Sequence, residues 1–437
     1  MQLMRSKKVI LGTVLAIAIL SIGIYSGILP GKRSKEKLPE VKLTVWGTLN
    51  EYETFNEPFN GYAQIRPNVT ITYEKIDPEH YEQTLINALA AGKGPDVFMF
   101  KNTWLPTHYD KIIPAGENQL AFTTFQSLFP KAVEQDFAPD KLIYALPLSI
   151  DTLALYYNED IFDGAAIALP PKDWLAFQND IPKLRQLDKS GNFIRAGAAI
   201  GGSNNTISNG TDILTSLMLQ NGTRMTNDEF TNATFAGAED GLFTGLDALD
   251  FYAKFSDPAD TYYTWNESME NSLDTFAKGR VGMVFGYLSD KKTIKSKNPF
   301  LRFKAAPLPQ PSDASAAVNT ARYWGLAVSN HSQTPEWAWD LILYLATNEA
   351  AAEKYMNATG ESPALRTLIQ KYAEDPNIGV FAKQALTARS WPLINEQLVT
   401  STLSTMIHAV ATKKLDSRTA ISQAEEQITA AMQARRK

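Results

Sequence analysis

The stretch GPDVFMF, residues 94–100, decides the fold, because a continuous apolar run after a Gly-Pro-Asp turn is typical of a buried parallel strand. Before it, apolar and polar residues alternate at 41–45 and 69–73, which predicts strands. Apolar residues recur at helical spacing at 52–62 and 81–92, which predicts helices. This order of strands and helices within 41–100 predicts a doubly wound α/β unit. Ligands of such sheets lie beyond the carboxyl ends of the strands, so 46–51 and 101–104 are candidate binding segments.

Length and composition limit what the chain can be. It has 437 residues, of which 44% are hydrophobic, with 42 Lys and Arg, 47 Asp and Glu, and no cysteine. The length fits two domains with full-sized cores. The missing cysteines exclude disulfide scaffolds, zinc ribbons, iron–sulfur clusters and cysteine nucleophiles. A net charge of −5 argues against a nucleic-acid binder, which needs a basic face.

The amino terminus is basic, whereas the rest of the chain is acidic. Residues 1–40 carry seven basic and two acidic side chains, and the other 397 residues carry 35 and 45. Val9 begins and Leu29 ends an uncharged, mostly aliphatic run, which as a helix reaches about 30 Å and spans a bilayer. The basic residues before this run predict that the amino terminus stays in the cytoplasm and the body is exported. We therefore expect a single transmembrane anchor and a polar linker over 1–40.

A cleaved signal peptide is the alternative for this leader. Signal peptides have a shorter apolar core, roughly 7–15 residues, and small residues at the cleavage site. No clear site of that kind follows the run, and there is no cysteine for lipid attachment. If the leader were cleaved, the body would be secreted rather than held at the membrane.

Five segments of the body resemble the extracellular solute-binding proteins (family 1) of ABC importers, the sugar-type group that includes maltose-binding protein. The first is similar to that family's third strand, the second to its YGLP…D…LYYNKDLF stretch, and the third to its F-x-x-G-[RK]-x-[AG]-M motif. The segments are GPDVFMF (94–100), YALPLSIDTLALYYNEDIF (144–162), FAKGRVGMVFGYLSD (276–290), AAPLPQP (305–311) and YWGLAVSNHSQTPEWAWDLILYLAT (323–347). They occur in the family's order and cover nearly the whole body.

The resemblance implies two α/β lobes, joined by crossing hinge strands, that close on a ligand. The first lobe would comprise 41–151 with 322–365, and the second 152–321 with 366–437. The implied function is not catalytic: an extracytoplasmic receptor captures a sugar or oligosaccharide and delivers it to the permease subunits of an ABC transporter. The resemblance implies neither a cofactor nor a metal.

A sugar site needs aromatic planes for the apolar ring faces and fixed polar groups for the hydroxyls. Charged acceptors help, because they form hydrogen bonds roughly twice as strong as neutral ones. Carried over position by position, the family's ligand-facing residues correspond to Trp46, Asn50, Glu51, Asn102, Trp104, Asp151, Ser203, Tyr287, Tyr323, Trp324 and Trp391.

Packing is an alternative role for several of these residues. Trp46 follows a predicted buried strand and fits the core nearly as well as a ligand site. Asp151 stands in an apolar run, where a carboxylate is costly unless it is paired, so it contacts either the ligand or a cation of the protein. One of Tyr323 and Trp324 should face inward, because neighbours on a strand point to opposite faces.

Two other functions remain open. Aromatic residues around Asp151 and Glu51 could form a cation box for a polyamine or another cationic solute. The same two carboxylates could be the acid pair of an exported glycosidase, although the sequence carries no signal for one. The four histidines lack the spacing of a helical metal site, and no phosphate-binding glycine motif is present in the sequence.

Overall fold

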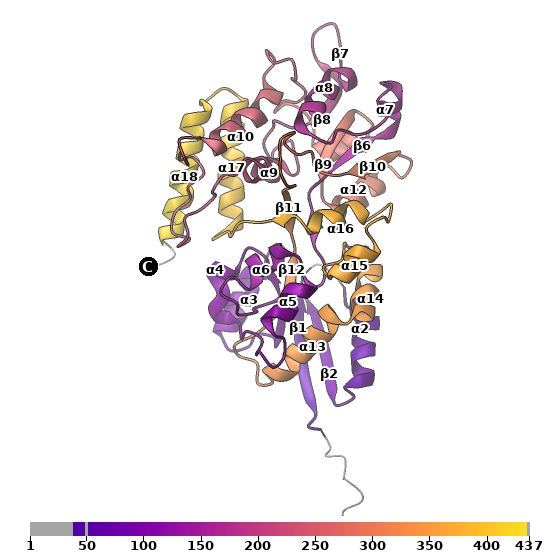
Figure 1. Ribbon diagram of the computed structural model, residues 1–437, viewed down its shortest axis with the longest axis vertical. Helices are drawn as coiled ribbons and strands as arrows, with labels where there is room; N and C mark the ends of the chain where they lie inside the picture. Colours follow the sequence, from indigo (N-terminus) through magenta and orange to yellow (C-terminus); the bar gives the residue numbers. More distant parts are fainter. Residues whose placement is uncertain (1–37, 49–50, 435–437) are drawn as a thin grey trace, which may run out of the picture.

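The computed structural model describes residues 38–48 and 51–434 (Figure 1). The predicted anchor between Val9 and Leu29 and the candidate residue Asn50 lie outside the described residues. Among the described helices, none combines the length and the apolar character that a membrane span requires.

The body consists of two α/β lobes, each built on a mixed five-stranded sheet (Figure 1). The first sheet has the order β2-β1-β3-β12-β4, and its strands are β1 (Val41–Gly47), β2 (Val69–Lys75), β3 (Val97–Lys101), β4 (Leu146–Pro147) and β12 (Trp324–Val328). β1 pairs in parallel with β2 and β3, and β12 runs antiparallel to β3 and β4. The predicted α/β unit over 41–100 is confirmed.

The sequence pattern explains how the first sheet packs. In β1, Val41, Leu43 and Val45 are buried and alternate with more exposed residues, because successive side chains of a strand point to opposite faces. β3 is buried at four consecutive positions, as expected of a central strand that is covered on both faces.

The second sheet has the order β10-β6-β9-β8-β7. Its strands are β6 (Ala154–Asn158), β7 (Gln186–Leu187), β8 (Phe193–Ala199), β9 (Val281–Gly286) and β10 (Phe303–Ala306). Only the pair of β8 and β9 is parallel within this sheet, and the other neighbours are antiparallel. Its central strand β9 is buried along its whole length, whereas β3 of the first sheet is buried at all positions except the last.

Crossing strands join the two lobes, as predicted. β5 (Asp151–Thr152) links β4 of the first sheet to β6 of the second, and β11 (Asn319–Arg322) leads from β10 back to β12. β5 and β11 pair antiparallel, and β13 (Ala388–Arg389) pairs in parallel with β11. The three strands form a small sheet of their own, and Figure 1 shows β11 between the lobes.

Helices complete both lobes. Those that pack on the core of the first sheet are α2 (Tyr52–Ile65), α3 (Tyr81–Ala90), α4 (Leu105–His108), α5 (Phe122–Leu128), α6 (Lys131–Phe137), α13 (Pro335–Thr347), α14 (Glu349–Thr359) and α15 (Arg366–Lys371). Those that pack on the core of the second are α7 (Glu159–Gly164), α8 (Trp174–Leu184), α9 (Gly210–Gln220), α10 (Thr244–Ala253), α11 (Ser272–Ala277), α12 (Leu288–Lys297), α16 (Gly379–Ala385), α17 (Glu396–Ala411) and α18 (Ser417–Ala434). Two short 3-10 turns are η1 (Tyr109–Lys111) and η2 (Lys254–Ser256).

Each lobe has its own hydrophobic core. The segment around α15 and α16 packs on both, because Leu368 and Ile369 are buried in the first core and Phe381 in the second. The predicted second-lobe segment 366–437 therefore begins with a stretch that belongs to both cores.

Candidate functional site

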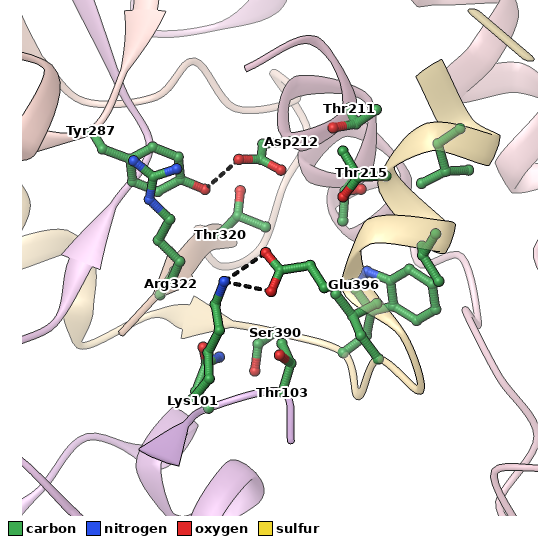
Figure 2. Close-up of a pocket in the computed structure, with 17 residues that line it drawn as sticks. Lys101, Thr103, Thr211, Asp212, Thr215, Tyr287, Thr320, Arg322, Ser390 and Glu396 are labelled. Atoms are coloured by element: carbon green, nitrogen blue, oxygen red, sulfur yellow. Dashed lines mark hydrogen bonds and ion pairs between the residues drawn. The ribbon is translucent and has the colours of Figure 1, made fainter. Parts of the chain in front are cut away.

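A pocket lies between the two lobes, close to the crossing strands (Figure 2). The first lobe contributes the end of β3 and the two residues after it. The second lobe contributes α9, Tyr287 at the start of α12, and α17. The hinge strand β11 and the segment 390–393 form the remaining walls. Residues of both lobes and of the hinge therefore line this pocket.

An ion pair crosses the pocket from one lobe to the other. Nζ of Lys101, at the end of β3, lies 2.6 Å from Oε1 of Glu396, at the start of α17 (Figure 2). Beside it, the backbone N–H of Leu393 donates to the carbonyl oxygen of Thr103 at 3.3 Å. These contacts hold the start of α17 against the end of β3.

A second charged group lines the opposite wall. The Tyr287 hydroxyl donates to Oδ2 of Asp212 at 2.9 Å, and the Arg322 guanidinium lies 3.7 Å from the centre of the Tyr287 ring (Figure 2). Burial raises the pKa of Asp212, although the nearby Arg322 charge and the Tyr287 hydrogen bond act in the opposite direction. The pocket thus contains two cations and two carboxylates, and their formal charges cancel.

Hydroxyl groups and apolar side chains cover the rest of the wall. The hydroxyl groups belong to Thr103, Thr211, Thr215, Thr320, Thr400 and Ser390, and the apolar surface to Ala321, Trp391, Leu393, Val399 and Leu403. The Thr103 hydroxyl is buried and has no hydrogen-bond partner among the described residues. A buried hydroxyl without a partner is costly, so a ligand that offers it a hydrogen bond would be favoured here.

Three of the predicted site residues line this pocket. Tyr287 and Trp391 do so as buried aromatic residues, and Asn102 does so at the end of β3. The Asn102 side chain is already engaged, because its Nδ2 donates to Asp136 at 3.1 Å and its Oδ1 accepts from the Tyr323 backbone N–H at 3.2 Å.

Three predicted tryptophans, Trp46, Trp104 and Trp324, lie in the first lobe, as their predicted lobe requires. The Trp104 ring is buried and lies edge-on to the Trp324 ring, with 5.2 Å between the centroids, and stacks on Tyr81 at 6.1 Å. Trp46 packs against the core of that lobe and is only partly buried. None of the three is among the residues that line the interlobe pocket, although Lys101 lies 5.6 Å from the Trp324 ring.

Asp151 is occupied by the protein itself. Its carboxylate accepts hydrogen bonds from the backbone N–H groups of Leu288, at 2.8 Å, and Ser289, at 3.1 Å, in the first turn of α12. A helix amino terminus stabilises a carboxylate through these unpaired N–H groups and through the helix dipole. The partner that the sequence requires for Asp151 is therefore mainly backbone, with Arg322 opposite it on β11.

The remaining predicted residues also have partners within the protein. The Ser203 hydroxyl donates to Glu267 at 2.9 Å, and the Tyr323 hydroxyl donates to Asp136 at 2.5 Å. Glu51 is exposed and forms an ion pair with Lys75. These residues do not line the interlobe pocket either.

Sequence reasoning missed the four charged residues of the pocket. Lys101 lies in the segment 101–104, which follows a predicted strand, so its position is a usable signal. Arg322 begins the predicted first-lobe segment 322–365, so its place where the chain crosses between the predicted lobes is a usable signal too. Asp212 and Glu396 lie on helices of the second lobe, and nothing in their local sequence separates them from ordinary surface carboxylates.

Comparisons with known proteins agree with this architecture. The maltodextrin-binding protein of Bacillus subtilis (strain 168) is 24% identical over 387 residues, covering 84% of this chain and 85% of that protein. The sugar-binding protein MalE of Xanthomonas citri superposes with a TM-score of 0.75 at 20% identity, over 90% of this chain and 98% of that one. An ABC transporter solute-binding protein of Thermotoga lettingae TMO, bound with α-D-tagatose, has a TM-score of 0.68 at 23% identity, over 90% of this chain and 99% of that one.

A sequence profile of bacterial extracellular solute-binding proteins matches residues 52–380, which is most of the described chain. The two lobes, the crossing strands and the pocket between them fit that match. The chain belongs to the bacterial extracellular solute-binding protein family.

Proposed function

We propose that this chain is an extracytoplasmic receptor that binds a sugar or oligosaccharide and delivers it to an ABC transporter. Family membership supports a binding role outside the cytoplasm. Sugars are the ligands named for the similar proteins of Bacillus subtilis, Xanthomonas citri and Thermotoga lettingae, and the last is named as part of an ABC transporter.

The composition of the interlobe pocket carries the proposal. Its many hydroxyl groups match the hydroxyls of a sugar, and Asp212 is a charged acceptor that strengthens such hydrogen bonds. Trp391 and Tyr287 supply aromatic surface for the apolar faces of a sugar ring. The three predicted residues that we retain for the site are Asn102, Tyr287 and Trp391.

The charge balance of the pocket favours a neutral ligand over a polyamine. Lys101 already forms an ion pair with Glu396. The positive charge of Arg322 acts on both Asp212 and Asp151 and lowers the pKa of each. A polycation would meet two fixed cations in this pocket and would have to displace one of them.

The glycosidase alternative loses its proposed acid pair. Glu51 is exposed and paired with Lys75, whereas Asp151 binds the first turn of α12. Two carboxylates that do not share one pocket cannot flank a glycosidic bond. The family and the fold are those of binding proteins rather than enzymes.

Closure of two lobes on the ligand is the mechanism that we assign. A sugar that contacts both lobes binds the closed form more tightly than the open form, and it shifts the population only by that difference in affinity. The lobes that move would be 41–151 with 322–365, and 152–321 with 366–437. The apolar run between Val9 and Leu29 would hold the receptor at the membrane beside its permease.

A thermal-shift screen tests the proposal. The full-length chain, purified in a detergent without a sugar headgroup, is heated with monosaccharides, maltodextrins of increasing length, or spermidine. A sugar at a hundredfold excess over its Kd should add about 2.7 kcal/mol to the free energy of unfolding. Stabilisation by spermidine alone would indicate a binding protein for a cationic solute. Hydrolysis of aryl-glycosides by the purified chain would indicate a glycosidase.

A further inference from the structure

The carboxylate of Asp136 accepts hydrogen bonds from three segments, each of which forms part of the pocket or of the hinge. Asp136, on α6 at the side of the first lobe that faces the second, accepts from the Asn102 side chain at 3.1 Å and from the Tyr323 hydroxyl at 2.5 Å (Figure 1). Its other oxygen accepts from the Ser390 hydroxyl. Asp136 itself is not among the residues that line the pocket.

Each of these donors is next to a residue that a ligand would meet. Asn102 lies between Lys101 and Thr103, at the end of β3. Ser390 lies beside Trp391 in the segment that leads to α17, and both line the pocket. Tyr323 joins the hinge strand β11 to β12. The Asp136 carboxylate therefore holds the end of β3, the hinge and the Trp391 segment in one arrangement.

We propose that Asp136 is a positioning residue that keeps the Trp391 segment in its binding position and makes sugar affinity depend on pH. This inference rests on the proposed sugar-receptor function. An ionised carboxylate accepts from all three donors through charge-assisted hydrogen bonds. When it is protonated, the hydroxyl that faces the proton has to turn and accept, and the remaining bonds lose the charge that strengthens them. The arrangement that binds sugar is thus the ionised one.

The charged groups near Asp136 are paired with other residues or exposed. Among the described residues, no Lys, Arg or His forms an ion pair with Asp136. Lys101 of β3 is paired with Glu396, Arg389 of β13 is exposed, and on α6 itself Lys131 is paired with Glu134. Desolvation raises the pKa of Asp136 to about 6, although the three donors lower it. Sugar affinity should therefore fall as the pH drops below about 6.

Hydrogen–deuterium exchange of the full-length chain tests the positioning role without any ligand. At pH 7.5 the Asp136→Asn variant should exchange faster than the wild type in 101–104 and 388–395. At pH 5 the two proteins should exchange alike, because the wild-type carboxyl group is then protonated. Glu425 lies on the distant helix α18, and its carboxylate accepts from the backbone N–H of Ala236, so Glu425→Gln should leave both segments unchanged. Equal exchange of wild type and Asp136→Asn at pH 7.5 would overturn the inference.

Ser390→Ala tests the same contact should Asp136→Asn fail to fold. It removes one donor and keeps the carboxylate, so 388–395 should again exchange faster at pH 7.5. Calorimetric titration with maltotriose adds the ligand. The wild-type affinity should fall about tenfold between pH 7.5 and pH 5, whereas the affinity of Asp136→Asn, which has no carboxyl group to titrate at this position, should be low and nearly constant.

The two measurements separate the two proposals. Exchange that follows the expected pattern in a protein that binds none of the screened sugars would leave the role of Asp136 in place and would contradict the sugar receptor. Sugar binding with the same pH dependence in wild type and Asp136→Asn would contradict the role of Asp136 alone.

Discussion

Trp391 is the residue whose role is simplest to isolate. Among the residues that line the pocket it is the one tryptophan, and it lies between Ser390, which donates to Asp136, and the start of α17. We expect Trp391→Ala to weaken sugar binding about tenfold to a hundredfold, because a buried aromatic contact is typical of the residues that dominate binding energy. Calorimetric titration measures the change. Trp337→Ala, on α13 of the first lobe, is the matched control and should leave the affinity unchanged.

Asp151 should affect stability in a pH-dependent way. Desolvation raises its pKa to about 6, although Arg322 and the α12 backbone lower it. Because the folded pKa lies above the ordinary value, the contribution of this group to the free energy of unfolding falls as pH rises from about 4 to about 6 and is then constant. In urea unfolding, the stability of wild type relative to Asp151→Asn should decrease over that range.

An exposed aspartate provides the control for this pH profile. Hydrogen bonds from Asn192 lower the pKa of Asp188, so its contribution is lost only at lower pH. The stability difference between wild type and Asp188→Asn should therefore stay flat between pH 4 and 6. A flat difference for Asp151→Asn as well would contradict the assignment of its pKa.

At this scale the sequence predicts residue types better than contacts. The apolar run around Asp151 indicates that its carboxylate needs a partner, and a ligand or a cation of the protein is expected there. Its partner is the backbone of α12, which lies well over a hundred positions further along the chain. No sequence pattern in α12 indicates that its first turn binds Asp151. Trp104 likewise follows a strand end, where a ligand site is expected, yet it folds back onto Tyr81.

At the scale of elements, strand β12 depends on a glycine. A Cβ atom at Gly325 would come within 2.7 Å of the Phe137 ring and 3.0 Å of the Ala145 side chain. We expect Gly325→Ala to reduce the free energy of unfolding by about 1–3 kcal/mol, because added volume in a packed core forces its neighbours to move. Urea unfolding measures the loss.

Gly164→Ala is the comparison for that substitution. A Cβ at Gly164, at the end of α7, would meet no atom within 4 Å. The substitution should be neutral or slightly stabilising, since alanine restricts the unfolded chain more than glycine does. A Gly325→Ala protein as stable as wild type would mean that β12 does not pack as tightly as described.

Elements were predictable where the local pattern is strong. The alternation in β1 and β2 and the apolar run of β3 are sufficient to predict these strands. Alternating apolar residues indicate a strand that is buried on one face, and a continuous apolar run indicates one that is buried on both. The segment 388–395 was not predictable in this way. Its place is fixed by β13 pairing with β11 and by Ser390 donating to Asp136, both of which depend on residues distant in sequence.

At the scale of the molecule, the ion pair of Lys101 and Glu396 should favour the closed arrangement of the lobes. Lys101→Glu places two carboxylates opposite each other, so the radius of gyration from X-ray scattering should increase and sugar affinity should fall about tenfold. The double variant Lys101→Glu/Glu396→Lys should restore both, because it restores the attraction.

An ion pair within one lobe is the control for this experiment. Lys304 and Glu159 are paired inside the second lobe at 2.7 Å. Lys304→Glu should therefore change neither the radius of gyration nor the affinity. If the double variant remained as open as Lys101→Glu, the pair would not act between the lobes.

The central claim is that a neutral sugar binds between the lobes, and a crystal structure of the full-length chain with the best sugar from the screen tests it most directly. We predict that the sugar lies in the interlobe pocket, with hydroxyls in hydrogen-bonding distance of Asp212 and Thr103 and a ring face against Trp391. A sugar bound at Trp46, Trp104 or Trp324 of the first lobe, or on an outer surface, would contradict this assignment of the binding site.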